Sequence, residues 1–163
     1  MRLSLVGLGL AGLALLGCGR TTSAPVQIDA IVWFAQASDT LLLRGSGLGI
    51  AWTLASPPAA YVNGNTQVLY RLGREPEVFY VEMLHSGEDP VRLFVVFRDR
   101  PLNTDTLSDA DRQLISSLGG QIRYVYTLTH DVSVAVPALA VRHLATSPLV
   151  AEAVPVGPPL HID

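Results

Sequence analysis

The residues of this chain whose types could do chemistry are four histidines, a group of aspartates and a glycine-rich loop. No two of the histidines are four positions apart, so the usual spacing of metal ligands on a helix is absent. Asp105, Asp109 and Asp111 surround an expected helix start, where carboxylates stabilise free N–H groups and the helix dipole. A calcium loop is the alternative, but it lacks the glycine and distal glutamate that such loops use. We therefore expect no metal and no cofactor; the histidines are His85, His130, His143 and His161.

The glycine-rich loop is residues 45–49 (GSGLG), which follow an apolar run. A dinucleotide-binding fingerprint needs a third glycine farther on and a helix behind it, whereas Pro57 arrives after seven residues. We interpret this segment as a loop between strands. Ser46 is the only candidate nucleophile there, but no GxSxG motif surrounds it and no histidine is marked as its base. The sequence therefore predicts a protein that is not an enzyme.

Cys18 is the one cysteine, and it ends an uncharged apolar run, residues 3–17, that follows Met1-Arg2. The run is too short to span a membrane comfortably, and it is typical of a signal peptide. Its end, LLGC, resembles the bacterial lipobox, where cleavage before the cysteine is followed by lipid attachment to the sulfur. An ordinary secretory signal with an unused cysteine is the alternative. On this resemblance we expect a signal peptide over 1–17, lipidation at Cys18, a tether over 18–25 and a location in the cell envelope. The outer membrane is favoured if the host has two membranes.

The composition argues against nucleic-acid binding. Eleven basic residues, all arginines, are scattered among fourteen acidic ones, for a net charge of −3. No internal repeat or low-complexity tract is visible.

The last third of the chain alternates between strand and helix patterns. Residues 91–98, 121–128, 131–136 and 149–154 are predicted strands. Ser108 begins one helix that Gly119-Gly120 ends, and a second helix follows Pro137. This βαββαβ order is the ferredoxin-like arrangement. The expected core is Phe94, Val96, Leu114, Ile115, Leu118, Val125, Val134, Leu139, Leu144 and Val150.

Residues 90–156 resemble the prodomain of subtilisin-like serine proteases and the free inhibitors related to it. The similar pieces are VVFRDRP, ISSLGGQI, YVYTLTHDVSVAVP and HLATSPLVAEAVP. In that family the last piece runs from a leucine to a proline and a valine before the closing strand, and Leu144, Pro148 and Val150 stand at those places. The resemblance implies a ferredoxin-like inhibitor domain over 90–163.

The same resemblance implies how such a domain would act. In the family the outer face of the sheet packs on the enzyme, and the segment after the last strand lies in the protease cleft like a substrate. Three prolines hold the tail after residue 154 extended. The residues implied to contact the protease are Leu160, His161, Ile162 and Asp163. A frayed chain end is the alternative.

Residues 26–89 predict a small β-rich unit of four to six short strands, with no helix and of no family that we recognise. QVLYRLG and EVFYVEML are expected strands, TLLLR belongs to a second strand pair, and Asn63-Gly64 predicts a hairpin turn. The expected core is Trp33, Phe34, Trp52 and Phe79.

The whole chain is thus expected to be an α+β envelope lipoprotein that binds and inhibits a subtilisin-like serine protease. The alternative is a non-catalytic envelope module that uses the same scaffold for another protein partner. A tail that reaches outward favours inhibition, whereas a tail folded back on residues 26–89 favours the alternative.

Overall fold

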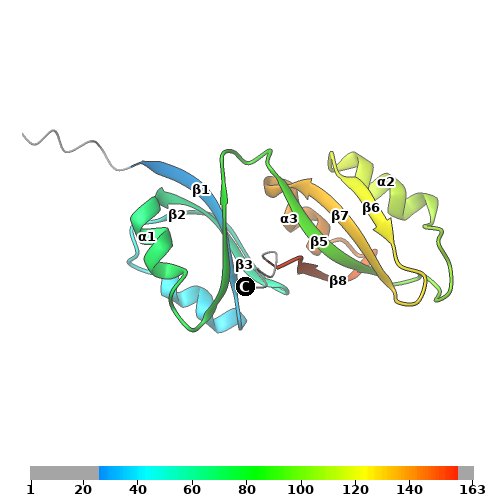
Figure 1. The fold of residues 1–163 in the computed structure, drawn as a ribbon, viewed down its shortest axis with the longest axis horizontal. Helices are drawn as coiled ribbons and strands as arrows, with labels where there is room; N and C mark the ends of the chain where they lie inside the picture. Colours follow the sequence, from blue (N-terminus) through cyan, green and yellow to red (C-terminus); the bar gives the residue numbers. More distant parts are fainter. Residues whose placement is uncertain (1–25, 158–163) are drawn as a thin grey trace, which may run out of the picture.

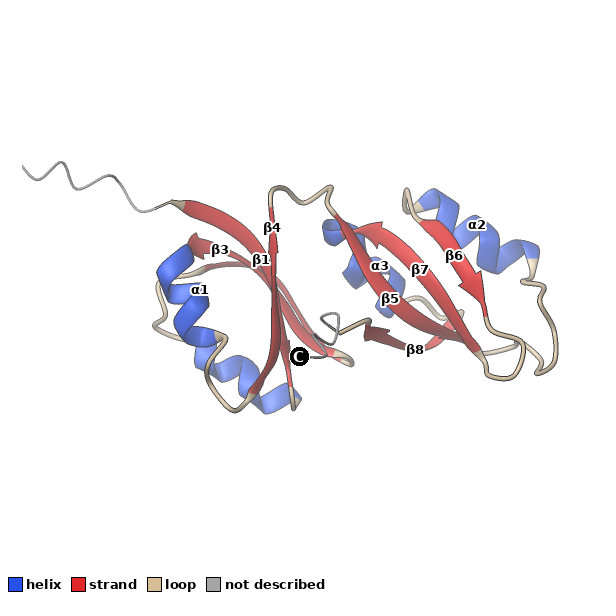
Figure 2. Cartoon of the chain, viewed as in Figure 1, coloured by secondary structure: helices blue, strands red, loops and turns tan. Residues whose placement is uncertain are grey.

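The computed structural model describes residues 26–157, which form a mixed α+β structure with two antiparallel four-stranded sheets (Figure 1). Figure 2 shows that each sheet is accompanied by its own helices. We call residues 27–84 the first unit and residues 90–155 the second unit; the loop between them is 85–89.

The first unit consists of β1 (Gln27–Phe34), a 3₁₀ helix η1 (Ala37–Leu43), β2 (Gly49–Ala55), β3 (Pro58–Asn65), α1 (Thr66–Leu72) and β4 (Val78–Leu84). Its sheet has the order β2-β3-β1-β4. The Asn65 side chain accepts a hydrogen bond from the Gln67 backbone N–H at 2.8 Å and so begins α1. Leu69 and Leu72, one turn apart, are the residues that α1 buries.

The second unit consists of β5 (Pro90–Phe97), α2 (Asp109–Ser117), β6 (Gln121–Val125), β7 (Asp131–Pro137), a 3₁₀ turn η2 (Ala138–Ala140), α3 (Val141–Ala145) and β8 (Val150–Pro155). Its sheet has the order β6-β7-β5-β8. The Ser108 side chain accepts from the Asp111 N–H at 3.1 Å at the start of α2. Gly119, with φ of +70°, ends the helix in the left-handed region, as predicted.

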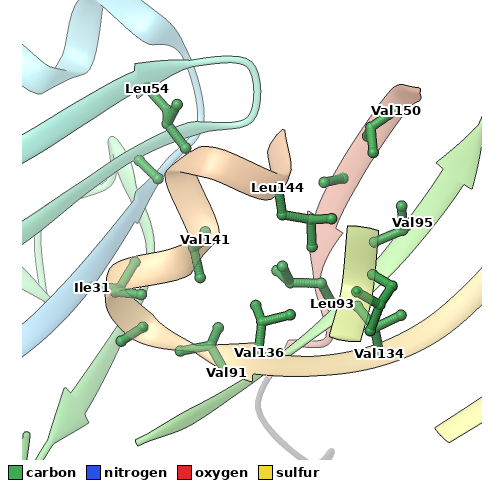
Figure 3. Packing of buried hydrophobic residues seen from close by; sticks show 14 of the residues in the cluster. Ile31, Leu54, Val91, Leu93, Val95, Val134, Val136, Val141, Leu144 and Val150 are labelled. Carbon is green, nitrogen blue, oxygen red and sulfur yellow. The ribbon is translucent and has the colours of Figure 1, made fainter. Parts of the chain in front are cut away.

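Two apolar clusters hold these layers together. The smaller lies between the first sheet and its own helices and includes Val32, Val62 and Leu69. The larger extends from the opposite face of the first sheet, past α3, to the inner face of the second sheet. Figure 3 shows Ile31 and Leu54 of the first unit on one side of the α3 segment and Val91 and Val136 of the second sheet nearby. The two units therefore share one core.

The two units repeat the same structure, which the sequence did not reveal. Strand, helix, strand, strand, helix and strand follow in the same order, and the two sheets have equivalent strand orders. From η1 onward, each residue of the first unit matches the residue of the second unit whose number is 72 higher, as Leu72 matches Leu144. In the first strand of each unit the difference is 63, as for Val32 and Val95. The matched buried pairs are Leu43 and Ile115, Val62 and Val134, Leu69 and Val141, and Val78 and Val150.

The register repeats as well. Ile31 pairs with Tyr61 and Glu82, and the matching Phe94 pairs with Ser133 and Val154. Even the irregularities recur, since a register shift follows Trp33 in β1 and Val96 in β5. Matched register shifts support a structural repeat, because each shift changes the twist and the pairing at one defined place in its sheet. The chain is thus a tandem structural repeat.

Several sequence-based expectations for the first unit are wrong. QVLYRLG forms α1 and TLLLR contributes to η1, because the asparagine cap and the three-residue spacing of Leu69 and Leu72 outweigh a short apolar run that also suits a strand. Asn63 and Gly64 lie within β3, and the hairpin turn is at Ser56-Pro57. Phe79 is 63% exposed, whereas Trp33, Phe34 and Trp52 are buried as predicted.

Six members of the expected core of the second unit are not fully buried, although three of them, Leu114, Leu118 and Val125, still pack against the core. Leu139 is 47% exposed, and Phe94 and Val96 are only half-buried. The buried residues of β5 are the alternate ones, Val91, Leu93, Val95 and Phe97. Since neighbouring strand residues point to opposite faces, Phe94 and Val96 lie on the face away from α2 and α3.

Candidate functional site

The residues predicted to be modified or to enter a protease cleft, Cys18 and Leu160–Asp163, lie outside the described residues. The described part of the tail continues past β8 as far as Gly157. There the Val156 N–H donates to the Arg92 carbonyl at 3.0 Å. Gly157 passes the Phe79 ring so closely that a Cβ on it would lie 3.9 Å from the ring. The start of the tail therefore lies against the first unit.

The other candidate chemical groups are not brought together. Nδ1 of His85 lies 3.2 Å from the Asp89 carboxylate, and Nδ1 of His130 lies 2.8 Å from the Arg100 carbonyl. Hydrogen bonds from His85, above all from its backbone N–H, lower the pKa of Asp89. Within residues 26–157 no group of three or more acidic, histidine or cysteine side chains could hold a metal ion. Gly45 and Gly47 have positive φ in a loop that leads directly into β2.

An exposed aromatic cluster lies on the face of the second sheet that α2 and α3 leave open. We call this face the outer face of the second sheet; it carries Arg92, Phe94, Val96, Tyr124, Tyr126, Asp131, Ser133, Ala135, Glu152 and Val154. The Tyr124 and Tyr126 rings are 4.6 Å apart, and Tyr126 meets Phe94 edge-on at 5.9 Å. Tyr124 is 59% exposed.

Strand geometry positions these aromatic rings. Phe94 is opposite Ser133 on β7, and Ser133 is in turn opposite Tyr124 on β6. Ser133 and Ala135 have small side chains on β7. The larger side chains on the two neighbouring strands, β5 and β6, therefore project farther from the sheet than those of β7. A hollow of about 310 Å³ results, bounded by Phe94, Tyr126, Thr129, Asp131 and Val154.

The two ends of this face differ in charge. Arg92 and Arg123 border a second hollow at one end. Val96 lies between Asp131 on β7 and Glu152 on β8 at the other. The outer face of the second sheet therefore has an apolar centre, with basic residues at one margin and acidic residues at the other.

Arg100, which sequence reasoning did not single out, fixes the loop at the edge of this face. Its guanidinium is buried and donates to the carbonyls of Thr104 and Tyr126, both at 2.6 Å, and of Thr129 at 3.0 Å. A fourth, longer contact reaches Asp131. Arg100 thus ties residues 98–107 to the turn between β6 and β7, which carries Tyr126.

The signal that could have found the aromatic face was present in β5. Arg92, Phe94 and Val96 are alternate residues of β5 and so lie on one face of the strand. The polar Arg92 indicates that this face is not the core. The apolar character of both faces hid that alternation.

Comparisons with known proteins do not add a relative. No family model matches this chain, and no curated protein or solved structure matches it significantly. In residues 26–157, no helix is long and apolar enough to cross a membrane.

Proposed function

We propose that this chain is an envelope lipoprotein, anchored through Cys18, that binds and inhibits a subtilisin-like serine protease. In this proposal the second unit is a ferredoxin-like, prodomain-like inhibitor domain. The order of its elements and strands supports it. The residues that carry the family resemblance at the closing strand are Leu144, Pro148 and Val150. Leu144 and Val150 are buried, and the Pro148 carbonyl accepts a hydrogen bond from Nε of Arg98 at 3.0 Å.

The observation that carries the proposal is the exposed aromatic outer face of the second sheet. A ring as exposed as Tyr124 stabilises a monomer little, whereas tyrosine and phenylalanine are enriched in protein interfaces and among their strongest contributors. The family resemblance assigns enzyme contact to this same face. The partner we propose is therefore the protease surface beside its cleft.

The tail supplies the inhibitory contact in this proposal. It leaves from β8, an edge strand of the second sheet, so the docking face and the tail can contact one partner together. Leu160, His161, Ile162 and Asp163 would then lie in the cleft in an extended form, and the prolines before them lower the entropy lost on binding.

The experiment is an inhibition assay on a panel of subtilisin-like proteases with the acyl-free mature protein. Tyr124→Ala should weaken inhibition about tenfold or more, which corresponds to about 1.4 kcal/mol, because tyrosine is enriched among the strongest contributors to interfaces. Deletion of 160–163 should weaken inhibition about tenfold or more because it removes the segment proposed to lie in the cleft. Tyr70→Ala is the matched control, because Tyr70 on α1 is similarly exposed, at 62%, and is remote from the proposed contact. A panel left fully active by the intact protein rules the proposal out.

One observation favours the alternative, an envelope module that binds another protein partner. Gly157 lies against Phe79, and a hollow of about 250 Å³ opens there between Trp33, Phe34 and Phe79 of the first unit and Val154 and Pro155 of the second. A tail that continues along the first unit would not enter a cleft. If deletion of 160–163 leaves protease inhibition unchanged while Tyr124→Ala removes it, the face binds the partner without the tail.

A further inference from the structure

The repeat shows that the chain buries one outer sheet face and leaves the equivalent face open. Ile31 and Leu54 of the first sheet match Phe94 and Tyr126 of the second. Ile31 is 0% and Leu54 6% exposed, against 37% for Tyr126. Ile31 and Leu54 belong to the same buried cluster as Val141 of α3, and Figure 3 shows both beside the α3 segment. The second unit thus covers the first sheet, and nothing in residues 26–157 covers the second.

The charges on the open face form two opposite pairs at its two ends. Arg92 and Arg123 border one end. Asp131 and Glu152 flank Val96, which lies four residues after Arg92 on β5, so the ends are about 13 Å apart at about 3.3 Å per residue. Arg92, Arg123 and Glu152 are exposed. None of these four charged side chains forms an ion pair within residues 26–157.

A face with this pattern is complementary to itself. If two such sheets stack face to face with their strands in opposite directions, the basic end of each sheet meets the acidic end of the other. A two-fold axis that lies between the sheets and crosses the strands produces this arrangement, and it brings the two aromatic clusters together at the centre. A two-fold axis along the strands would instead place arginine against arginine, and like charges repel. The charges therefore select one of the two symmetric ways to stack the sheets.

We propose that the outer face of the second sheet is the interface of a two-fold symmetric homodimer. Arg92 of each protomer lies opposite Glu152 and Asp131 of its partner, and the Phe94 and Tyr124 rings meet their copies near the axis. Such self-matching contacts are the commonest kind in soluble homo-oligomers. They also close the stack of layers, because each protomer covers the sheet face that the other leaves open.

The homodimer goes beyond the proposed function and does not need a protease. It covers the same surface that the proposed function assigns to the protease, so dimer formation and protease binding exclude each other. The contact is small. Four strands about 4.8 Å apart, each with about five residues, span roughly 19 by 17 Å, or about 320 Å² on each protomer. A standard interface buries about 800 Å² on each partner, so we expect a weak dimer whose population depends on protein concentration.

Sedimentation of the acyl-free mature protein over a range of concentrations tests the dimer. Every sample carries Cys18→Ser, which removes the one cysteine and so excludes a disulfide-linked dimer. Arg92→Glu and Glu152→Arg should each weaken dimerisation about tenfold or more, because each places like charges opposite one another at both symmetric contacts. Arg74→Glu is the matched control. It makes the same change in net charge at an exposed position of the first unit, and it should leave the dimer unchanged.

Charge exchange then tests the direction of the strands. The double variant Arg92→Glu with Glu152→Arg should dimerise like the parent protein, and a mixture of the two single variants should form a heterodimer. Tyr124→Ala should weaken the dimer while far-UV circular dichroism stays unchanged, because the ring is exposed in the monomer.

Three results would each overturn the homodimer. They are a protein that stays monomeric up to about 1 mM, growth into species larger than a dimer, and a dimer that Arg92→Glu does not weaken. Failure of the double variant to dimerise would overturn the proposed direction of the strands. None of these measurements contains a protease, so their failure is distinct from failure of the proposed function.

Discussion

Replacing Arg100 tests whether the loop beside the aromatic face is held by one buried guanidinium. Arg100→Lys keeps the positive charge and most of the stem, but an ammonium cannot direct donors in the fixed fork that the arginine uses. The three contacts at 2.6, 2.6 and 3.0 Å point to three separate carbonyls, of Thr104, Tyr126 and Thr129. We expect lysine to keep one of them at most.

The magnitude follows from those lost contacts. A hydrogen bond to a charged group contributes about 1.5–3 kcal/mol, so two lost contacts correspond to about 3–6 kcal/mol before relaxation. The loop is at the surface, and water can reach part of the freed carbonyls. The remaining ammonium is also still buried without a carboxylate partner among the described salt bridges. We therefore expect the free energy of unfolding to fall by about 3 kcal/mol.

Urea unfolding followed by far-UV circular dichroism measures this loss. Arg98→Lys is the control, because Arg98 is exposed and its guanidinium makes one contact, from Nε to the Pro148 carbonyl. Its free energy of unfolding should change by less than about 1 kcal/mol. Equal stability of Arg100→Lys and the wild type would refute the reasoning, since it would mean that water replaces the guanidinium at no cost.

Three further predictions concern lipidation, pH dependence and the core. Cys18→Ser should abolish labelling by a palmitate analogue and leave an uncleaved or soluble form; a wild-type protein that is never labelled would contradict the proposed anchor. Burial raises the pKa of the Glu82 carboxyl above 4.5, and the Trp33 indole N–H, which lies nearby without hydrogen-bonding geometry, only partly opposes this. The folded state thus binds the proton of Glu82 more tightly than the unfolded state does. The free energy of unfolding should therefore fall as the pH rises from about 4.5 through the pKa of Glu82 in the folded state. Glu82→Gln should remove that slope and raise the urea midpoint at pH 7. Leu144→Ala should cost about 2–5 kcal/mol because Leu144 is fully buried, and Leu114→Ala distinctly less because Leu114 is only partly buried; thermal unfolding compares the two.

Local signals in the sequence predicted the elements of the second unit correctly. Ser108 marks the start of α2, Gly119 its end, and the alternating segments became β5, β6, β7 and β8 within a few residues of the predicted bounds. These signals are local, because a cap or a turn depends on a few neighbouring residues. The expectations for Cys18 and Leu160–Asp163 rest on sequence resemblance and remain predictions.

Which apolar residues lie in the core and which form a surface depends on how the sheets and helices pack together. Both faces of β5 carry apolar residues. Whether Phe94 is buried or exposed therefore depends on which face α2 and α3 cover, and local sequence does not set this. For the same reason the repeat escaped the sequence, since matched positions such as Leu54 and Tyr126 share a place in the sheet but not a residue type. Leu54 is buried in the cluster that includes α3, whereas Tyr126 lies on an exposed face of the second sheet. The physical reason is that strand position sets the face of a side chain, while the neighbouring layer sets its chemistry.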